Sequence, residues 1–182
     1  KPLVPKEKIY IALNKPVGVV CTAAEEVKDN IIDYLGIDDY VFPIGRLDKD
    51  SQGLIILTND GDLNHKLISP KYHVDKVYYA EINAPITEKD IKAFENGVTL
   101  DDGYKCLEAK LEIISATEKG SEVRVTIQEG KYHQVKRMFE AVGKKVIYLK
   151  REEFGGLILD PELEEGEYRE LTDDELALLR SY

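Results

Sequence analysis

Residues 54–57, Leu-Ile-Ile-Leu, constrain the fold of this 182-residue chain more than any other segment. The run is apolar without interruption, and turn-forming residues bound it, with Gly53 before it and Asn59-Asp60-Gly61 after it. A strand with one solvent-facing side alternates apolar and polar residues, so a continuous apolar run predicts a strand buried on both faces. The loop that precedes the run is therefore anchored on a buried strand.

The remaining pattern predicts an α+β fold around a mostly antiparallel sheet. Period-two alternation predicts strands at 76–82, 107–113 and 122–128, with a buried face made of Leu107, Ala109, Leu111, Ile113, Val123, Val125 and Ile127. Shorter strands are expected at 10–13, 19–22, 146–149 and 157–159. Helices are expected at 30–36, 62–68, 87–96 and 132–142, and after the capping residues 172–175.

Length and composition indicate one large domain or two small lobes that share a core. No apolar run approaches the roughly 20 residues that span a bilayer, and the N-terminus lacks the apolar core of a signal peptide. The only cysteines, Cys21 and Cys106, form no CxxC pair, which favours reduced core thiols. We therefore expect a cytoplasmic protein without a membrane partner. It is expected to be a monomer, because no exposed apolar heptad stands out.

The net charge of −10 counts against nucleic-acid binding, because such domains usually carry a basic excess. The charges are unevenly distributed, however. Acidic residues concentrate between 152 and 175, where a solvated surface is the favoured interpretation. Basic residues concentrate between 131 and 151. The basic segment is compatible with a one-faced patch as well as with an ordinary solvated surface.

Asp48 is the leading candidate for chemistry. It lies in the sequence Gly45-Arg46-Leu47-Asp48, which places a carboxylate beside a guanidinium at the mouth of the anchored loop. The alternative is a loop aspartate that caps a turn. Calcium binding is disfavoured: the sequence from Asp48 imitates the start of an EF-hand loop, but its twelfth position is Asn59 rather than glutamate.

Two further stretches carry candidate residues. Tyr78, on the strand at 76–82, offers a ring for stacking on an unstacked base, although packing in the core is the alternative. In residues 129–142, Gly130 leads into a helix whose apolar stripe is Val135, Met138, Phe139 and Val142. Lys136 and Arg137 lie off that stripe, near a helix N-terminus that favours anions, or on a solvated face. The three histidines lack carboxylates at ligand spacing, so no metal site is expected.

These three stretches resemble, in order and approximate spacing, the RsuA-type pseudouridine synthases, a family that modifies ribosomal RNA. Four more blocks extend the resemblance from about residue 8 to residue 179: residues 14–18, 69–73, 149–157 and 166–172. The family implies a mixed, largely antiparallel sheet in two lobes with flanking helices and a central cleft. It also implies isomerisation of uridine to pseudouridine in folded RNA without a metal or organic cofactor.

The resemblance assigns roles to matching positions. Asp48 is the expected catalytic carboxylate, Tyr78 the aromatic residue that packs on the target base, and Lys136 the basic residue that pairs with the aspartate. Arg46 is expected to help hold the loop and the flipped-out nucleotide. The other expected RNA contacts are Lys76, Lys131, His133, Gln134 and Arg137.

The family also bears on domain organisation and substrate. Its members usually carry an S4-like RNA-binding domain first, so we expect residues 1–7 to be a linker that follows such a domain, absent here, and residues 8–182 to be the catalytic domain. Blocks 69–73 and 133–139 resemble the small-subunit branch, which predicts 16S ribosomal RNA or a partly assembled small subunit as the partner. The alternatives are a large-subunit synthase and a catalytically silent RNA-binding or ribosome-assembly module. A metal-dependent hydrolase is disfavoured because clustered ligands are lacking.

Overall fold

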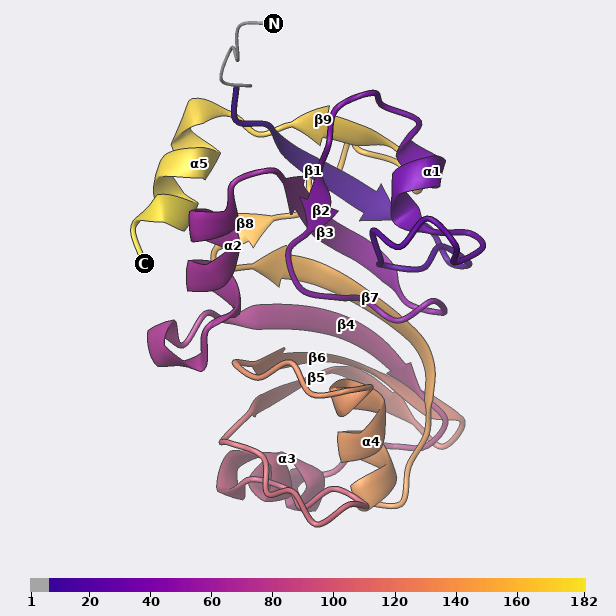
Figure 1. Cartoon of the computed structure of the whole chain (residues 1–182). Helices are drawn as coiled ribbons and strands as arrows, with labels where there is room; N and C mark the ends of the chain where they lie inside the picture. Colours follow the sequence, from indigo (N-terminus) through magenta and orange to yellow (C-terminus); the bar gives the residue numbers. More distant parts are fainter. Residues whose placement is uncertain (1–6) are drawn as a thin grey trace, which may run out of the picture.

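The computed structural model describes residues 7–182 (Figure 1). Residues 1–6, most of the expected linker, lie outside the described residues. The strands are β1 (Tyr10–Lys15), β2 (Phe42–Pro43), β3 (Gln52–Thr58), β4 (Lys76–Ile82), β5 (Lys110–Thr117), β6 (Gly120–Ile127), β7 (Val146–Phe154), β8 (Leu157–Ile158) and β9 (Tyr168–Glu170). The helices are α1 (Ile31–Leu35), α2 (Gly61–Ile68), the 3₁₀ turn η1 (Pro70–Tyr72), α3 (Glu88–Asn96), α4 (Gln134–Ala141) and α5 (Asp173–Arg180). None of the helices in this range is long and apolar enough to cross a membrane.

The strands form one sheet in the order β5-β6-β4-β7-β3-β1-β9, with β2 beside β3 and β8 beside β7. The predicted α+β class and the largely antiparallel sheet are confirmed. Between named strands of the described chain, the one parallel pairing joins β3 to β7, and it covers only Gln52–Gly53 opposite Lys150–Arg151. This short link divides the sheet into two halves. We call β3, β1, β9 and β2 the two-sided half and β5, β6, β4 and β7 the one-sided half.

In the two-sided half, both faces of β3 are buried, as the apolar run predicts. Ile55 and Leu57 belong to the main hydrophobic cluster, which includes Ile31 of α1. Leu54 and Ile56 point the other way, into a second cluster with residues of α2 and α5. Each of these four β3 side chains is at most 1% exposed.

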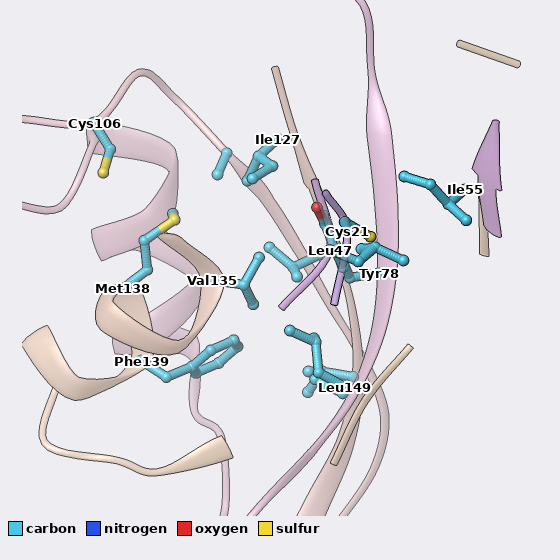
Figure 2. Close-up of a cluster of buried hydrophobic side chains, with 14 of the residues drawn as sticks. Cys21, Leu47, Ile55, Tyr78, Cys106, Ile127, Val135, Met138, Phe139 and Leu149 are labelled. Carbon is cyan, nitrogen blue, oxygen red and sulfur yellow. The ribbon is translucent and has the colours of Figure 1, made fainter. Parts of the chain in front are cut away.

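In the one-sided half, helices cover a single face of the sheet. Val135, Met138 and Phe139 of α4 pack toward the strand residues Ile127 and Leu149 (Figure 2). The predicted buried face of β6 is confirmed, because Val123, Val125 and Ile127 are at most 3% exposed. The opposite face carries partly or fully exposed side chains: Tyr79, Glu81, Glu122, Arg124 and Thr126. The alternating sequence pattern therefore reflects cover on one face only.

Helix ends follow the predicted capping residues. Asn30 accepts the Asp33 N–H at the start of α1, and Gly36 ends that helix in the left-handed conformation. Thr87 with Asp90, and Thr172 with Glu175, form capping boxes at α3 and α5. These local signals need few tertiary contacts, which explains why the sequence located these helices well.

Two strand predictions are wrong in part. Residues 19–22 form an isolated bridge rather than a strand, because the Val20 backbone bonds to Asp29 and Ile31 instead of a sheet edge. The strand expected at 107–113 is β5, which begins at Lys110 and ends at Thr117. Leu107 is 48% exposed and Ile113 39%, because β5 is an edge strand with a register shift after Ile113. Ala109 and Leu111 are buried as expected.

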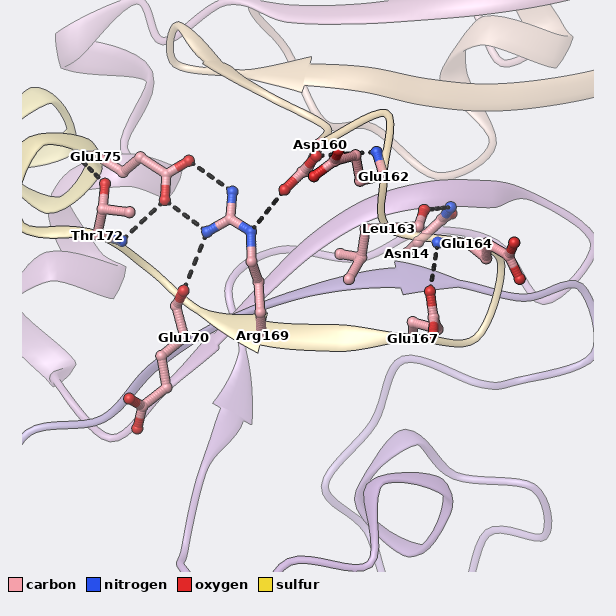
Figure 3. Close-up of polar contacts among 10 residues, drawn as sticks. All are labelled: Asn14, Asp160, Glu162, Leu163, Glu164, Glu167, Arg169, Glu170, Thr172 and Glu175. Carbon is pink, nitrogen blue, oxygen red and sulfur yellow. Dashed lines mark hydrogen bonds and ion pairs between the residues drawn. The ribbon is translucent and has the colours of Figure 1, made fainter.

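The acidic C-terminal segment is more ordered than a merely solvated surface. Arg169 of β9 donates to both carboxylate oxygens of Glu175, at 2.8 and 2.9 Å, and to Asp160 at 3.0 Å (Figure 3). The Arg169 pair lowers the pKa of Glu175 to about 2. These bonds fasten α5 and the loop before β9 to the edge of the two-sided half.

Candidate active site

Asp48 lies in the loop between β2 and β3, where the two halves of the sheet meet. The Asp48 carbonyl accepts the Ser51 N–H at 3.0 Å, which closes a tight turn. The Lys49 carbonyl in that turn accepts the Gly18 N–H at 2.8 Å. The turn is thus tied to the segment after β1 as well as to β3.

Position 53, near the start of β3, requires glycine. Its φ is +119°, and a Cβ at this position would lie 2.2 Å from the Arg151 carbonyl oxygen of β7. Only glycine allows that conformation and that approach without displacing backbone. Gly53 therefore permits the parallel link between β3 and β7, and with it the placement of the Asp48 loop.

Lys15 bonds to the turn that carries Asp48. Sequence reasoning did not identify it as a candidate. Its side chain is fully buried, and Nζ donates to the carbonyls of Pro16 at 2.7 Å and Lys49 at 3.3 Å. Burial lowers the pKa of Lys15, while the charges of Asp48 and other acids oppose that shift. The sequence signal that could have identified Lys15 is a lysine directly after a predicted strand and before Pro16.

The Asp48 carboxylate receives two basic side chains from the start of α4. Lys136 Nζ lies 3.4 Å from Oδ2, and His133 Nε2 lies 3.4 Å from Oδ1. Lys136 Nζ also lies 3.5 Å from Asp50 Oδ2. The Asp48 and Lys136 side chains are 21% and 23% exposed, whereas Asp50 is 78% exposed. The tertiary structure thus joins a carboxylate from the two-sided half to basic side chains from the one-sided half.

His133 adopts the left-handed conformation, with φ of 48°, immediately before α4. Its ring stacks on Tyr132, with ring centroids 3.8 Å apart and planes inclined by 15°. A depression of about 540 Å³ adjoins this pair and is lined by Asp101, Asp102, Tyr132, His133 and Arg137. Tyr132 is 76% exposed, so it presents a solvent-exposed aromatic ring beside His133.

Gln134 does not face the surface, which corrects its expected role as an RNA contact. It is 4% exposed, and its amide oxygen accepts the Lys131 N–H at 3.0 Å. Its amide nitrogen donates to Glu129 at 3.0 Å. Because both ends of the amide are engaged, Gln134 shapes the turn that leads into α4.

Arg137, an expected RNA contact, is engaged within the protein. Its guanidinium lies 2.7 Å from Asp101 and 3.0 Å from Asp102, and it donates to the Tyr132 carbonyl at 2.9 Å. The hydrogen bonds that Arg137 donates to Asp101 raise the pKa of its guanidinium. The residue fastens α4 to the 101–102 loop, and its charge is already balanced.

Tyr78 is 8% exposed and belongs to the main hydrophobic cluster. In Figure 2 its side chain lies beside Cys21 and Leu47, the residue that precedes Asp48. Its hydroxyl makes no hydrogen bond within residues 7–182. It is not one of the fully buried polar atoms that lack a partner, so the hydroxyl keeps some exposed surface. The ring thus packs in the core and reaches the surface at its edge, so both sequence-based interpretations are compatible with its position.

The other predicted basic residues differ in their surroundings. Arg46 is exposed and has no ion-pair partner among residues 7–182, and Lys131 Nζ lies 4.6 Å from the Tyr104 ring centroid. Lys76 is largely buried, and Nζ has one weak bond, to the Gln128 carbonyl at 3.4 Å. Burial, reinforced by the charge of Arg151, lowers the pKa of Lys76 to about 8. Within the same residues, no three His, Cys, Asp or Glu side chains gather as metal ligands would.

Comparison with known proteins agrees with this geometry. Residues 9–141 match the family model of RNA pseudouridylate synthases. An uncharacterized RNA pseudouridine synthase of Bacillus subtilis is 46% identical over 177 residues, which cover 96% of this chain and 74% of that protein. The ribosomal small subunit pseudouridine synthase A of Escherichia coli is 40% identical, over 92% of this chain and 72% of that protein.

Two further matches extend the comparison. The ribosomal large subunit pseudouridine synthase B of B. subtilis is 40% identical, over 97% of this chain and 73% of that protein. A crystal structure of a pseudouridylate synthase superposes with a TM-score of 0.85 at 41% identity, over 95% of this chain and 74% of that one. The match in sequence and in fold shows that this chain belongs to the RNA pseudouridylate synthase family.

Proposed function

We propose that this chain isomerises a specific uridine of ribosomal RNA to pseudouridine, with the small-subunit RNA, free or partly assembled, as its substrate. The observation that carries the proposal is the contact between Asp48 and Lys136, 3.4 Å apart at the junction of the two halves. Blocks 69–73 and 133–139 favour the small-subunit branch. The relatives include synthases named for either ribosomal subunit, so a large-subunit RNA is the alternative substrate.

The roles follow from the chemistry of the reaction. Isomerisation breaks the bond between N1 of uracil and C1′ of ribose, forms a bond from C5 to C1′, releases the C5 proton to solvent, and leaves N1 to take up a proton. Asp48 supplies the carboxylate that acts on the target nucleotide. Lys136 and His133 stabilise its charge in a partly shielded site. Asp50 also lies 3.5 Å from Lys136, but its side chain is 78% exposed, whereas that of Asp48 is partly shielded.

The nucleotide must leave its stack to reach Asp48. Unstacking costs a few kcal/mol, which contacts in the protein then offset. The exposed edge of Tyr78 is the proposed packing surface for the base. Arg46, Lys76 and Lys131 are the proposed RNA contacts, because no carboxylate pairs with them within residues 7–182. With a net charge of −10, binding should be weak and steeply dependent on salt.

The test is release of tritium from 5-tritiated uridine in 16S RNA, in 23S RNA and in partial small-subunit particles. We expect release from a small-subunit substrate by the parent chain and none by Asp48→Asn, which is nearly isosteric. Asp50→Asn is the matched control, because Asp50 also lies within 3.5 Å of Lys136 but is exposed. It should retain activity within about twofold.

Each result separates the hypotheses. Release from 23S RNA alone would replace the small-subunit assignment by the large-subunit one. Activity retained by Asp48→Asn would refute the role of Asp48. Binding of these RNAs without release by the parent chain would indicate a silent RNA-binding module.

A further inference from the structure

Tyr132 presents the face of an aromatic ring to solvent beside the Asp48 site. Its other face is covered, because it stacks on His133 with ring centroids 3.8 Å apart and planes inclined by 15°. The residue is nevertheless 76% exposed, so the face that points away from His133 must be open. Among residues 7–182, Tyr132 is the most exposed of the large hydrophobic side chains. Single exposed hydrophobic residues are common in proteins, so the argument depends on how this ring is held and where it lies.

Contacts on two sides hold Tyr132 in place. Its carbonyl accepts a hydrogen bond from Arg137 Nη1 at 2.9 Å, and the same guanidinium is fastened to Asp101 at 2.7 Å. The His133 ring on which it stacks has its own anchor, since Nε2 lies 3.4 Å from Asp48 Oδ1. The Tyr132 ring is therefore a prepared platform, and the His133 ring lies between it and the Asp48 carboxylate.

The charges around the ring favour a neutral group over a phosphate. Tyr132 lines the depression of about 540 Å³ together with Arg137 and the two carboxylates of Asp101 and Asp102. The side chains of Asp101 and Asp102 are 77% and 60% exposed, so both carboxylates face solvent there. Two acids beside one guanidinium repel the negative charge of a phosphate. An uncharged, flat nucleobase meets no such repulsion.

The position of the ring indicates which base it would meet. When the target uridine leaves its stack, the nucleotides on either side of it lose a stacking partner. Exposed aromatic side chains stack on such bases whatever their sequence, because every base has a flat face. A base on the open face of Tyr132 lies beyond the His133 ring as seen from Asp48. It therefore belongs to a nucleotide next to the target or one further along, and not to the target itself.

We propose that the open face of Tyr132 stacks on the base of a nucleotide that flanks the target uridine, and thereby helps to hold the RNA with its target displaced toward Asp48. This inference rests on the proposed function, because the flanking nucleotide is defined by the uridine on which Asp48 acts. Tyr132 was not among the RNA contacts expected from the sequence, and it adds a base contact outside the pocket of the target nucleotide.

The experiment begins with an RNA fragment in which the parent chain has been shown to convert one uridine. Absence of any conversion would count against the proposed function and would be seen before Tyr132 is tested. In the Asp48→Asn background, Kd is then measured for that fragment and for four versions of it. Each version lacks one base, at one of the two positions on either side of the target. We expect removal of the base at one of these positions to weaken binding at least about fivefold.

Tyr132→Ala in the same background should weaken binding of the intact fragment at least about fivefold. It should change the Kd of the fragment that lacks the stacking base less than about twofold, because the partner of the ring is already missing. Tyr132→Phe keeps the ring and should bind as the parent does. Tyr40→Ala is the matched control. Tyr40 is 65% exposed and packs on Phe42, which pairs with Thr58 at the end of β3 away from the Asp48 loop.

Several results would overturn the proposal. Equal weakening of the intact fragment and of all four base-lacking fragments by Tyr132→Ala would mean that the ring acts only by positioning His133. An unchanged Kd for the intact fragment would mean that the ring does not contact RNA. Binding by Tyr132→Phe as weak as by Tyr132→Ala would assign the contact to the hydroxyl rather than to the ring face. Tyr132→Leu, which keeps apolar bulk without a flat ring, provides the same comparison if Tyr132→Ala fails to fold.

Discussion

The two halves of the sheet carry the site in different ways. The Asp48 loop leads into β3, whose two faces are both buried, whereas Lys136 lies on a helix that covers a half with one open face. The carboxylate is thus held by a strand with packing on every side. The cations come from a helix that packs on one side and faces the site on the other. The difference teaches that the Asp48 carboxylate is placed by the most constrained element of the fold.

The strand pairing between the two halves covers very few residues. Their parallel link covers Gln52–Gly53 and Lys150–Arg151, while the antiparallel pairing within each half is much longer. The site lies at this short link, because loops and strand ends can present side chains only where regular pairing stops. The predictions below test this comparison between the halves, beginning with the link itself.

Gly53→Ala should have the largest effect, because it breaks the link. The new Cβ would meet the backbone of β7 at 2.2 Å with φ at +119°. We expect the free energy of unfolding to fall by more than about 4 kcal/mol, with loss of activity. Chemical denaturation measures the change. Gly61→Ala is the matched control, since no atom lies within 4 Å of its added Cβ.

Core truncations should distinguish the two halves directly. Ile55→Ala and Ile56→Ala, on opposite faces of β3, should each lower the free energy of unfolding by about 3 kcal/mol. On β6 of the one-sided half, Val125→Ala should cost about 2 kcal/mol. Thr126→Ala, on the open face, should change stability by less than about 0.5 kcal/mol. A large loss for Thr126→Ala would mean that this face is covered in the protein.

Lys136→Met should lower activity rather than stability, because it removes the charge at Asp48 while it keeps the length of the side chain. We expect kcat to fall about ten- to hundredfold, which corresponds to about 1.4–2.8 kcal/mol of lost transition-state stabilisation. Tritium release under saturating RNA measures it. Lys145→Met, an exposed lysine beyond α4, should retain full activity. Full activity of Lys136→Met would show that Asp48 works without this cation.

Glu175→Gln should have the smallest effect, at the edge of the two-sided half. Gln preserves the capping box with Thr172 but removes the charge that pairs with Arg169. At neutral pH we expect a loss of about 1 kcal/mol in the free energy of unfolding.

The pH dependence of this variant sharpens the test. The pKa of Glu175 is lowered from 4.5 to about 2 in the folded protein, so its contribution is present above pH 4.5 and is lost as the pH falls toward 2. Thermal unfolding between pH 5 and pH 2 should therefore decline less steeply in Glu175→Gln than in the parent. Equal slopes would contradict the Arg169 pairing.

Local patterns located most elements because their causes are local. The apolar run at 54–57 needed no knowledge of its neighbours to predict burial on both faces, and Thr87 and Thr172 cap helices through bonds within three residues. The failures have tertiary causes. Residues 19–22 have strand-like composition, but the Val20 backbone bonds to Asp29 and Ile31 rather than to a strand. Leu107 is exposed because the edge strand starts later than its alternation suggests.

The sequence by itself determined the α+β class, the anchored loop of Asp48 and the set of basic residues around α4, because periodicity, turn chemistry and motif order are properties of neighbours in the chain. Only the tertiary structure decided which side chains meet. It brought Lys136 to Asp48, used Gln134 and Arg137 inside the fold, and buried Lys15 against the Asp48 turn. Whether a polar group is free or already paired depends on contacts between distant segments, and the chain reveals those contacts only when it is folded.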